Sequence, residues 1–166
     1  MKAIYLITIL LVSSISNAQS GFEKQFREII SDTANGFTHF SGDTILNRRG
    51  GELMQYASLH TLENTSKNSI AYFGGSILST YVYLATIAES VQQNEGVRIC
   101  DEWKNRIEIL LDSGFVVKKQ IGQEPFPGQY GWRFSKGKLL IEINMLPGEK
   151  NDMNRVSLGI IYTIIK

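Results

Sequence analysis

Two segments of the chain repeat the same succession of residue types, and this recurrence constrains the fold more than any other feature. REIISDTANGF begins at Arg27 and IEILLDSGF begins at Ile107; each passes from apolar residues at helical spacing to small polar residues, a glycine and a phenylalanine. Asn35-Gly36 supplies the left-handed stop that often ends a helix, and Ser113-Gly114 ends the second segment. The sequence therefore predicts two amphipathic helices, each of which must bury its apolar stripe against another element.

Runs of alternating, β-branched and aromatic residues follow each helix and predict strands. In the first half they are YASLHTL (56–62), SIAYFGG (69–75) and STYVYLAT (79–86), and in the second half FVVKKQI (115–121), YGWRFS (130–135), KLLIEINML (138–146) and RVSLGIIYTII (155–165). FTHFSGD (37–43) predicts a short extended segment, and TILNRRGGELMQ (44–55) predicts irregular chain. The second helix is expected within 88–112, with Gly96 as a point where it breaks into two pieces.

This order predicts an α+β fold, with one curved antiparallel sheet or two abutting sheets covered by two amphipathic helices. Two interpretations of the recurrence stay open. In one, residues 20–87 and 88–166 are tandem helix-plus-β-meander repeats; in the other, helix followed by meander simply recurs, as it does in many α+β folds. Secreted bacterial inhibitors built from tandem helix-plus-sheet units and secretion chaperones share this outline, which carries no function by itself.

The first residues have the layout of a secretory signal peptide. Lys2 precedes an apolar run from Ala3 to Val12, and SSISNAQS follows, with a small residue at Ala18 suited to cleavage. The apolar run is too short for a stable transmembrane helix, and no cysteine follows the cut to carry a lipid. We expect residues 1–18 to be a cleaved leader of Gram-negative type, with 19–166 as a single domain in the periplasm or outside the cell.

The charge and cysteine content of the mature chain narrow its chemistry. The whole chain holds 17 Lys and Arg against 16 Asp and Glu, and the leader removes Lys2, so the mature protein is neutral and has no general attraction for nucleic acid. Cys100 is the only cysteine, so packing must hold the fold without an internal disulfide. We interpret Cys100 as a buried apolar residue of the second helix rather than a free nucleophile.

The segment EPFPGQYGW (124–132) is the strongest candidate binding element. It places Phe126, Tyr130 and Trp132 among prolines and glycines, and rigid aromatic side chains on a loop suit a protein or glycan partner. The alternative interpretation is that Tyr130 and Trp132 begin a strand and pack into the core. A second aromatic stripe is formed by Tyr72, Tyr81 and Tyr83. These residues either form a binding surface or lie at the edge of the core with their hydroxyls in contact with water.

HFSGD suggests a nucleophile, a histidine and an acid, because His39, Ser41 and Asp43 would share one face of an extended strand. Residues two apart on a strand lie about 7 Å apart, beyond hydrogen-bond reach, and no GxSxG motif occurs. The two histidines, His39 and His60, are far apart in sequence, and no HExxH, CxxC pair, EF-hand or Walker motif is present. We therefore expect no metal and no cofactor.

Two triplets resemble the Asp-Thr-apolar O-glycosylation sites of some Gram-negative lineages. They place the sugar on Thr33, in DTA, and on Thr44, in DTI. Short triplets recur by chance, so these are weak assignments.

The sequence thus favours an exported binding protein of the cell envelope, such as an inhibitor or immunity-type partner of another secreted protein, and not an enzyme. One alternative is a small envelope hydrolase that uses His39 or His60, which requires a concave pocket with a histidine beside a carboxylate. Another is an assembly subunit that pairs through its long apolar C-terminal strand, if that strand is a free edge.

Overall fold

The computed structural model describes residues 21–48, 52–122, 129–148 and 153–165. The segment predicted as a cleaved leader, residues 1–18, lies outside these residues. A helix covers residues 21–31, and two short 3-10 helices follow, η1 (Thr33–Asn35) and η2 (Thr38–Phe40). The second long helix is α2 (Gln93–Glu108). The apolar stripe of the first predicted helix is buried as expected, since Phe22, Phe26 and Ile29 are at most 2% exposed.

Eight strands form one antiparallel sheet. In chain order they are β1 (Ser41–Arg48), β2 (Leu53–Ser58), β3 (Ser66–Gly74), β4 (Leu78–Val91), β5 (Val116–Ile121), β6 (Tyr130–Lys136), β7 (Leu139–Pro147) and β8 (Asn154–Ile165). The strand order in the sheet is β1-β2-β3-β4-β8-β7-β6-β5. Each half of the chain contributes a meander, and the two meanders meet where β4 pairs with β8.

The C-terminal strand is therefore a central strand. β8 pairs with β4 on one side and with β7 on the other, along most of its length. The assembly hypothesis required β8 to present a free edge, and this premise is corrected by the pairing. The sheet is not closed, and its two edge strands are β1 and β5.

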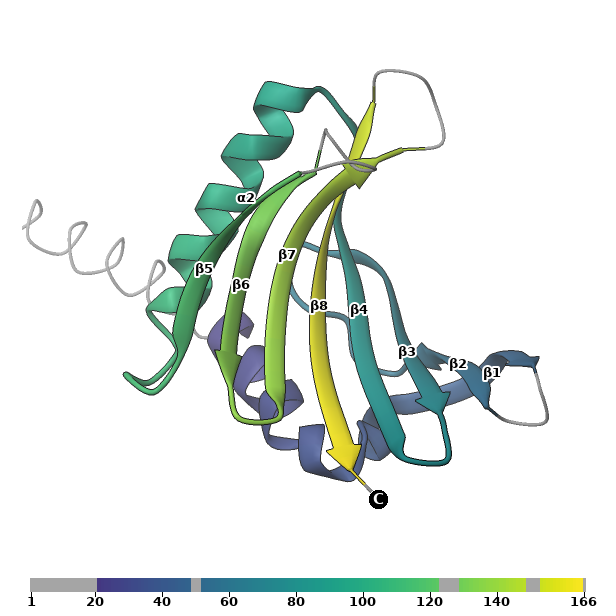
Figure 1. The fold of residues 1–166 in the computed structure, drawn as a ribbon. Coiled ribbons are helices and arrows are strands. Elements are labelled where there is room, and N and C mark those ends of the chain that lie inside the picture. Colours follow the sequence, from purple (N-terminus) through teal and green to yellow (C-terminus); the bar gives the residue numbers. More distant parts are fainter. Residues whose placement is uncertain (1–20, 49–51, 123–128, 149–152, 166) are drawn as a thin grey trace, which may run out of the picture.

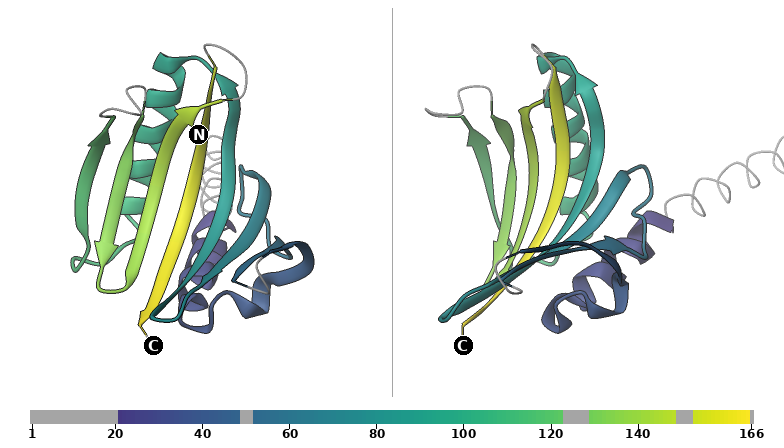
Figure 2. Two further views of the ribbon diagram at one scale, coloured as in Figure 1. Left: turned by 45° about the vertical axis from the view of Figure 1, so that its right-hand side comes forward. Right: turned by 90° about the vertical axis from the view of Figure 1, so that its right-hand side faces the viewer.

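Both long helices lie on the same side of the sheet, which curls so that its other side is concave (Figures 1 and 2). α2 packs across β6, β7 and β8 and reaches β4. The fold is accordingly α+β, but strands dominate and the helices cover the sheet only loosely.

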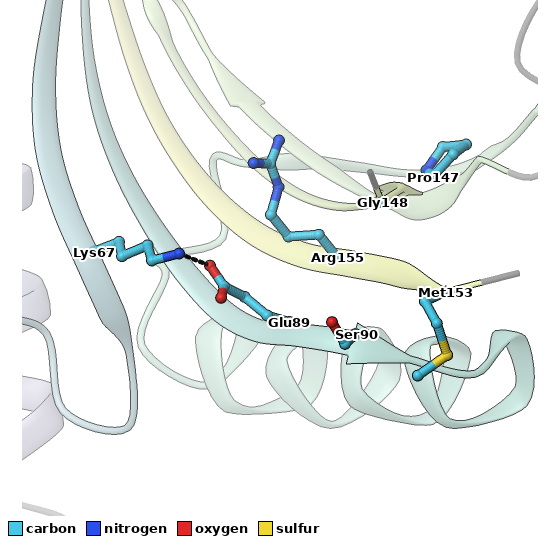
Figure 3. Close-up of a pocket in the computed structure, with 7 residues that line it drawn as sticks. All are labelled: Lys67, Glu89, Ser90, Pro147, Gly148, Met153 and Arg155. Atoms are coloured by element: carbon cyan, nitrogen blue, oxygen red, sulfur yellow. Dashed lines mark hydrogen bonds and ion pairs between the residues drawn. The ribbon is translucent and has the colours of Figure 1, made fainter. Parts of the chain in front are cut away.

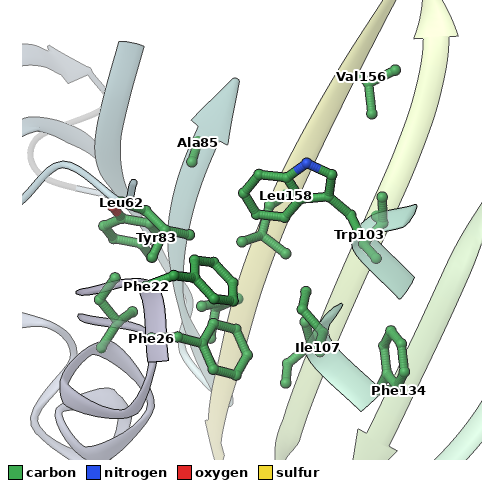
Figure 4. Packing of buried hydrophobic residues seen from close by; sticks show 14 of the residues in the cluster. Phe22, Phe26, Leu62, Tyr83, Ala85, Trp103, Ile107, Phe134, Val156 and Leu158 are labelled. Atoms are coloured by element: carbon green, nitrogen blue, oxygen red, sulfur yellow. The ribbon is translucent and has the colours of Figure 1, made fainter. Parts of the chain in front are cut away.

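The core lies between the helices and the convex face of the sheet (Figure 4). Phe22 meets Trp103 of α2 edge to face, with ring centroids 5.4 Å apart, so the two helices pack against each other as well as on the sheet. The strands supply the opposing layer with side chains that are fully buried: Tyr83, Phe134, Ile141, Ile143, Met145, Leu158 and Ile160.

Several local expectations need correction. The segment predicted as extended forms η2 at Thr38–Phe40 before β1 begins, and the segment predicted as irregular contains most of β1 and the start of β2. α2 continues through Gly96 without a break. A Cβ at Gly96 would collide with the sulfur of Met145, so this glycine allows the helix to approach the sheet closely.

Candidate binding surface and histidine site

The concave face of the sheet is defined by side-chain alternation. Residues next to the buried positions of each strand point away from the helices. On β4, Tyr83 and Ala85 face the core, so Leu84 faces the concave side, and its neighbours in register are Ser69 and Gly159. Among the described residues, no helix or strand covers this face (Figures 1 and 2).

Large apolar side chains stay exposed on this face. Leu84 is 37% exposed, and Phe73 of β3 is 48% exposed beside Thr80. Further exposed members are Leu78, Val116 and Ile165. Apolar residues exposed singly are ordinary, but a set on one uncovered concave sheet face is typical of an interaction surface.

The charges on the concave face are partly neutralised. Arg133 of β6 pairs with Glu142 of β7 at 2.5 Å, and Lys67 pairs with Glu89 at 2.6 Å. Arg155 is exposed, lies on the concave face, and has no ion-pair partner among the described residues. The face therefore combines apolar groups with a cation that is free to bind a carboxylate.

A depression of about 450 Å³ adjoins one end of the concave face (Figure 3). Its walls come from β3, β4, β7 and β8, and its lining is Lys67, Glu89, Ser90, Pro147, Gly148, Met153 and Arg155. Arg155 and the Lys67–Glu89 pair project from the side of the sheet opposite α2 (Figure 3). Lysine and arginine side chains near the surface suit an anionic group of a partner.

The side chains at the centre of the concave face are small. Gly159 of β8 lies between Leu84 and Glu142 in register, and a Cβ built there would meet no atom nearer than 3.9 Å. Ser157 on the same strand, and Ser69 and Ala71 on β3, are also small. Gly159, Ser69 and Ala71 are buried between their neighbours, so a partner on this face contacts the exposed side chains of Phe73 and Leu84 around them.

The aromatic candidates Tyr130 and Trp132 lie on β6, facing α2 rather than the concave side. The hydroxyl of Tyr130 and the indole nitrogen of Trp132 both donate hydrogen bonds of 2.7 Å to Oδ1 of Asp101. Burial and the bond to Asp101 raise the pKa of Tyr130. Both side chains are half-buried and tie the sheet to the helix, and Phe126 lies outside the described residues.

Lysines surround these two rings. The ammonium of Lys119 on β5 lies 4.8 Å from the ring centre of Tyr130, and that of Lys104 on α2 lies 5.3 Å from Trp132. A cation over an aromatic face is attracted by the electron density of the ring. These contacts place the ammonium of Lys119 over the rings of β6, the strand next to the edge strand β5.

A histidine and a carboxylate meet at the end of the first helix. Nδ1 of His39 lies 2.5 Å from Oδ1 of Asp32, and the backbone N–H of His39 donates to Oδ2 at 3.1 Å. Asn35 donates a third hydrogen bond at 2.9 Å. Burial alone would raise the pKa of Asp32, but the bonds from His39 and Asn35 together hold it below its usual value. An ionised Asp32 can only accept, so Nδ1 of His39 carries the proton in this hydrogen bond.

This pair lines a second, shallow depression of about 350 Å³ that also contains His60. The ring of His60 packs against Phe40 at 4.5 Å, and the hydroxyl of Ser31 is engaged with the carbonyl of Glu28. The alternation expected for HFSGD is not present, because His39 lies in η2 and Ser41 begins β1. Sequence reasoning missed Asp32 as the partner of His39.

The two weak glycosylation candidates differ in accessibility. Thr33 is buried, and its hydroxyl donates to the carbonyl of Ile30 at 2.8 Å, whereas Thr44 on β1 is exposed. Modification at either residue stays a prediction, and only Thr44 presents its hydroxyl to solvent in the folded protein.

Cys100 is fully buried in α2, as expected. Burial, with a smaller contribution from Asp101, raises the pKa of its thiol to about 12. A thiol with that pKa holds almost no thiolate at neutral pH and is a poor nucleophile.

The described part of the chain holds no group of three or more His, Cys, Asp or Glu side chains arranged to bind a metal ion. Within those same residues, no helix has both the length and the hydropathy that a membrane span requires. No protein-family model, curated protein or solved structure matches the chain.

Proposed function

We propose that this chain is an exported binding protein that receives another protein on the concave face of its sheet. The observation that carries the proposal is the asymmetry of the sheet. One face is packed under two helices, and the other keeps Phe73 and Leu84 exposed around small residues. The partner presents apolar side chains to this face and a carboxylate to Arg155.

A comparison of two double variants tests the proposal. Phe73→Thr with Leu84→Thr removes apolar area from the concave face and introduces β-branched residues, which suit strands. Ile77→Thr with Ile109→Thr is the matched control, because both isoleucines are exposed but lie outside the strands of this face. The immobilised proteins are exposed to envelope extract of the producing organism, the retained protein is purified, and its Kd for each variant is measured.

The concave-face variant is expected to bind the purified partner at least about tenfold more weakly, since burial of one large apolar side chain contributes about 1.5–3 kcal/mol. The control variant is expected to bind like the unmodified protein. Equal affinity of all three proteins would contradict docking on the concave face.

The histidine site supports one second candidate, the hydrolase alternative. In it, Asp32 orients His39, and Nε2 of His39 removes a proton from a water that attacks an ester or amide carbon. The protonated His39 then returns that proton to the alcohol or amine that leaves as the ester or amide bond breaks. The observation in its favour is that Asp32, His39 and His60 line one depression. An activated ester such as p-nitrophenyl acetate is the probe. His39→Gln should lower the rate about 100-fold or more, and a wild-type rate equal to that of free imidazole would eliminate the candidate.

We also infer that residues 20–87 and 88–166 are tandem repeats. Each half is a helix followed by four strands, although β4 continues past the boundary to Val91, and the fourth strands, β4 and β8, pair antiparallel at the centre. If the halves are copies, a chain of residues 88–166 should form a dimer in which β8 of one copy takes the place of β4 for the other. A monomeric or unfolded fragment in analytical ultracentrifugation would count against the inference.

A further inference from the structure

The free edge formed by β5 offers an interaction surface distinct from the concave face. β5 is the last strand of the sheet, and its pairing with β6 runs without a register shift from Val116 to Ile121. The opposite edge strand, β1, has two register shifts against β2. Irregularities of this kind make it harder for another strand to pair with an edge. β5 is therefore the regular edge of the two.

The backbone groups that β5 leaves unpaired can be assigned from the register. Gly122 donates its N–H to the carbonyl of Gln129 at 2.7 Å, so this is a hydrogen-bonded pair. Hydrogen-bonded and non-bonded pairs alternate along an antiparallel ladder. The pairs of Ile121 with Tyr130 and of Lys119 with Trp132 are consequently the non-bonded ones. The N–H and C=O groups of Val117, Lys119 and Ile121 thus point away from β6.

The charges of this edge select what can pair with it. Lys118 and Lys119 are both exposed, and their side chains leave the strand on opposite faces. If two copies paired about a twofold axis along the whole strand, Lys119 would lie opposite its own counterpart, and like charges directly opposite each other are destabilising. A strand with two adjacent acidic residues instead places one carboxylate opposite each lysine.

We propose that β5 is a docking edge for an extended acidic segment of another protein, which adds to the sheet as a ninth strand. The outward backbone groups of Val117, Lys119 and Ile121 pair with its main chain. Its two adjacent carboxylates meet Lys118 and Lys119. Apolar residues near its ends contact Val116 and Ile121, which are 55% and 70% exposed. Val116 also borders the concave face, but this docking uses neither Phe73 nor Leu84, on which the proposed function rests.

The test uses two synthetic peptides, acetyl-TVTEETVT-amide and acetyl-TVTKKTVT-amide, with the full mature protein at low ionic strength. Fluorescence anisotropy of labelled peptides gives Kd, and amide exchange measured by NMR locates the contact. The acidic peptide should bind about tenfold or more tightly than the basic peptide, because cross-strand pairs of opposite charge stabilise and pairs of like charge destabilise. The amides of Val117, Lys119 and Ile121 should exchange more slowly when it is bound.

Variants separate charge from backbone pairing. Lys118→Glu with Lys119→Glu should reverse the preference between the peptides, whereas Lys24→Glu with Arg27→Glu, the same charge change on the first helix, should not. Lys119→Pro removes an outward N–H that β6 does not use and should abolish binding, while Lys119→Thr keeps that N–H and should retain weaker binding. The concave-face variant Phe73→Thr with Leu84→Thr should bind the acidic peptide normally.

Several results would overturn the docking edge. They are equal affinity for the two peptides, unchanged exchange of the three outward amides, or a folded Lys119→Pro protein that binds like Lys119→Thr. Circular dichroism establishes whether the proline variant is folded. If it is not, the double glutamate variant and the exchange data decide the question. Loss of peptide binding in the concave-face variant would show that the two surfaces are one.

Discussion

The ring of His39 is hydrogen-bonded through Nδ1 to the buried carboxylate of Asp32, although the histidine side chain itself is 71% exposed. The link joins the end of the first helix to η2, across the turn at Gly36 and Phe37. Asp32 is 6% exposed and receives hydrogen bonds from two residues. It therefore fixes the corner that leads from the helix into β1.

Replacement of Asp32 by alanine should destabilise the protein by about 1–3 kcal/mol, because three hydrogen bonds to a charged acceptor are lost. Urea unfolding measures this difference. Asp43→Ala is the matched control, since Asp43 is exposed on β1, and its unfolding free energy should stay within about 0.5 kcal/mol of wild type. Equal stability of the two variants would show that the corner does not depend on the carboxylate.

The same carboxylate gives an acid dependence with a defined sign. The pKa of Asp32 is lowered by folding from its ordinary value of 3.8. A lowered folded-state pKa stabilises the folded protein above the unfolded pKa and ceases to do so as the pH falls through the folded value. The stability difference between wild type and Asp32→Asn should therefore shrink below about pH 4. A difference that grows on acidification would contradict this assignment.

Part of this fold follows from local pattern, and part depends on non-local pairing. The helical stripe of Phe22, Phe26 and Ile29 predicts the first helix because helical spacing is a local signal. The central place of β8 does not follow from its sequence, because a long apolar strand has the same residue pattern whether it pairs with one neighbouring strand or with two. Alternation separates the two faces of a strand, but it does not show that Phe134 lies under a helix while Phe73 is uncovered.

The histidine site shows a different limit of sequence reasoning. His39 reaches Asp32 only because Phe37 adopts a left-handed backbone conformation, with φ of 59°. Bulky residues rarely take this conformation, so the residue type at position 37 does not predict the turn. For the aromatic candidates, the strand that begins at Tyr130 was predicted, but the sequence left open whether Tyr130 and Trp132 belong to a binding loop or pack inside, since their bonds to Asp101 of α2 are non-local.

Two glycines of the sheet, Gly159 on β8 and Gly131 on β6, should respond in opposite ways to alanine. A Cβ at Gly159 makes only ordinary contacts with Leu84 and Ile161, so Gly159→Ala should stabilise the protein by about 0.4–1 kcal/mol through reduced unfolded-state entropy. A Cβ at Gly131 would collide with the carbonyl oxygen of Ile143, so Gly131→Ala should destabilise it by more than about 1 kcal/mol. Thermal unfolding of both variants measures the contrast, and equal melting temperatures would disprove the close approach of β6 to β7 at Gly131.

Asp101 accepts hydrogen bonds from both Tyr130 and Trp132, and this predicts how substitutions of Trp132 change the stability of the protein. Trp132→Phe keeps an aromatic ring over the helix but loses the hydrogen bond to Oδ1, and should cost about 1–2 kcal/mol. Trp132→Ala also loses apolar contact and should cost more, about 3 kcal/mol. Urea unfolding followed by circular dichroism measures both. If Trp132→Ala is as stable as wild type, the side chain is free for a partner, as the loop hypothesis assumed.

Tyr83 predicts the behaviour of the protein in alkali. Its ring is fully buried, its hydroxyl donates to Asn68 at 2.7 Å, and burial raises its pKa to about 12. A raised folded-state pKa means that the stabilisation is complete below the unfolded value near 10 and is lost as the pH rises through 12. Wild type should therefore lose stability more steeply than Tyr83→Phe between pH 10 and about 12, although the variant is less stable by about 1 kcal/mol at neutral pH. Tyr162→Phe on β8, a half-buried tyrosine, serves as the control. Parallel stability curves for wild type and Tyr83→Phe would mean that Tyr83 ionises without unfolding and is not enclosed by the core.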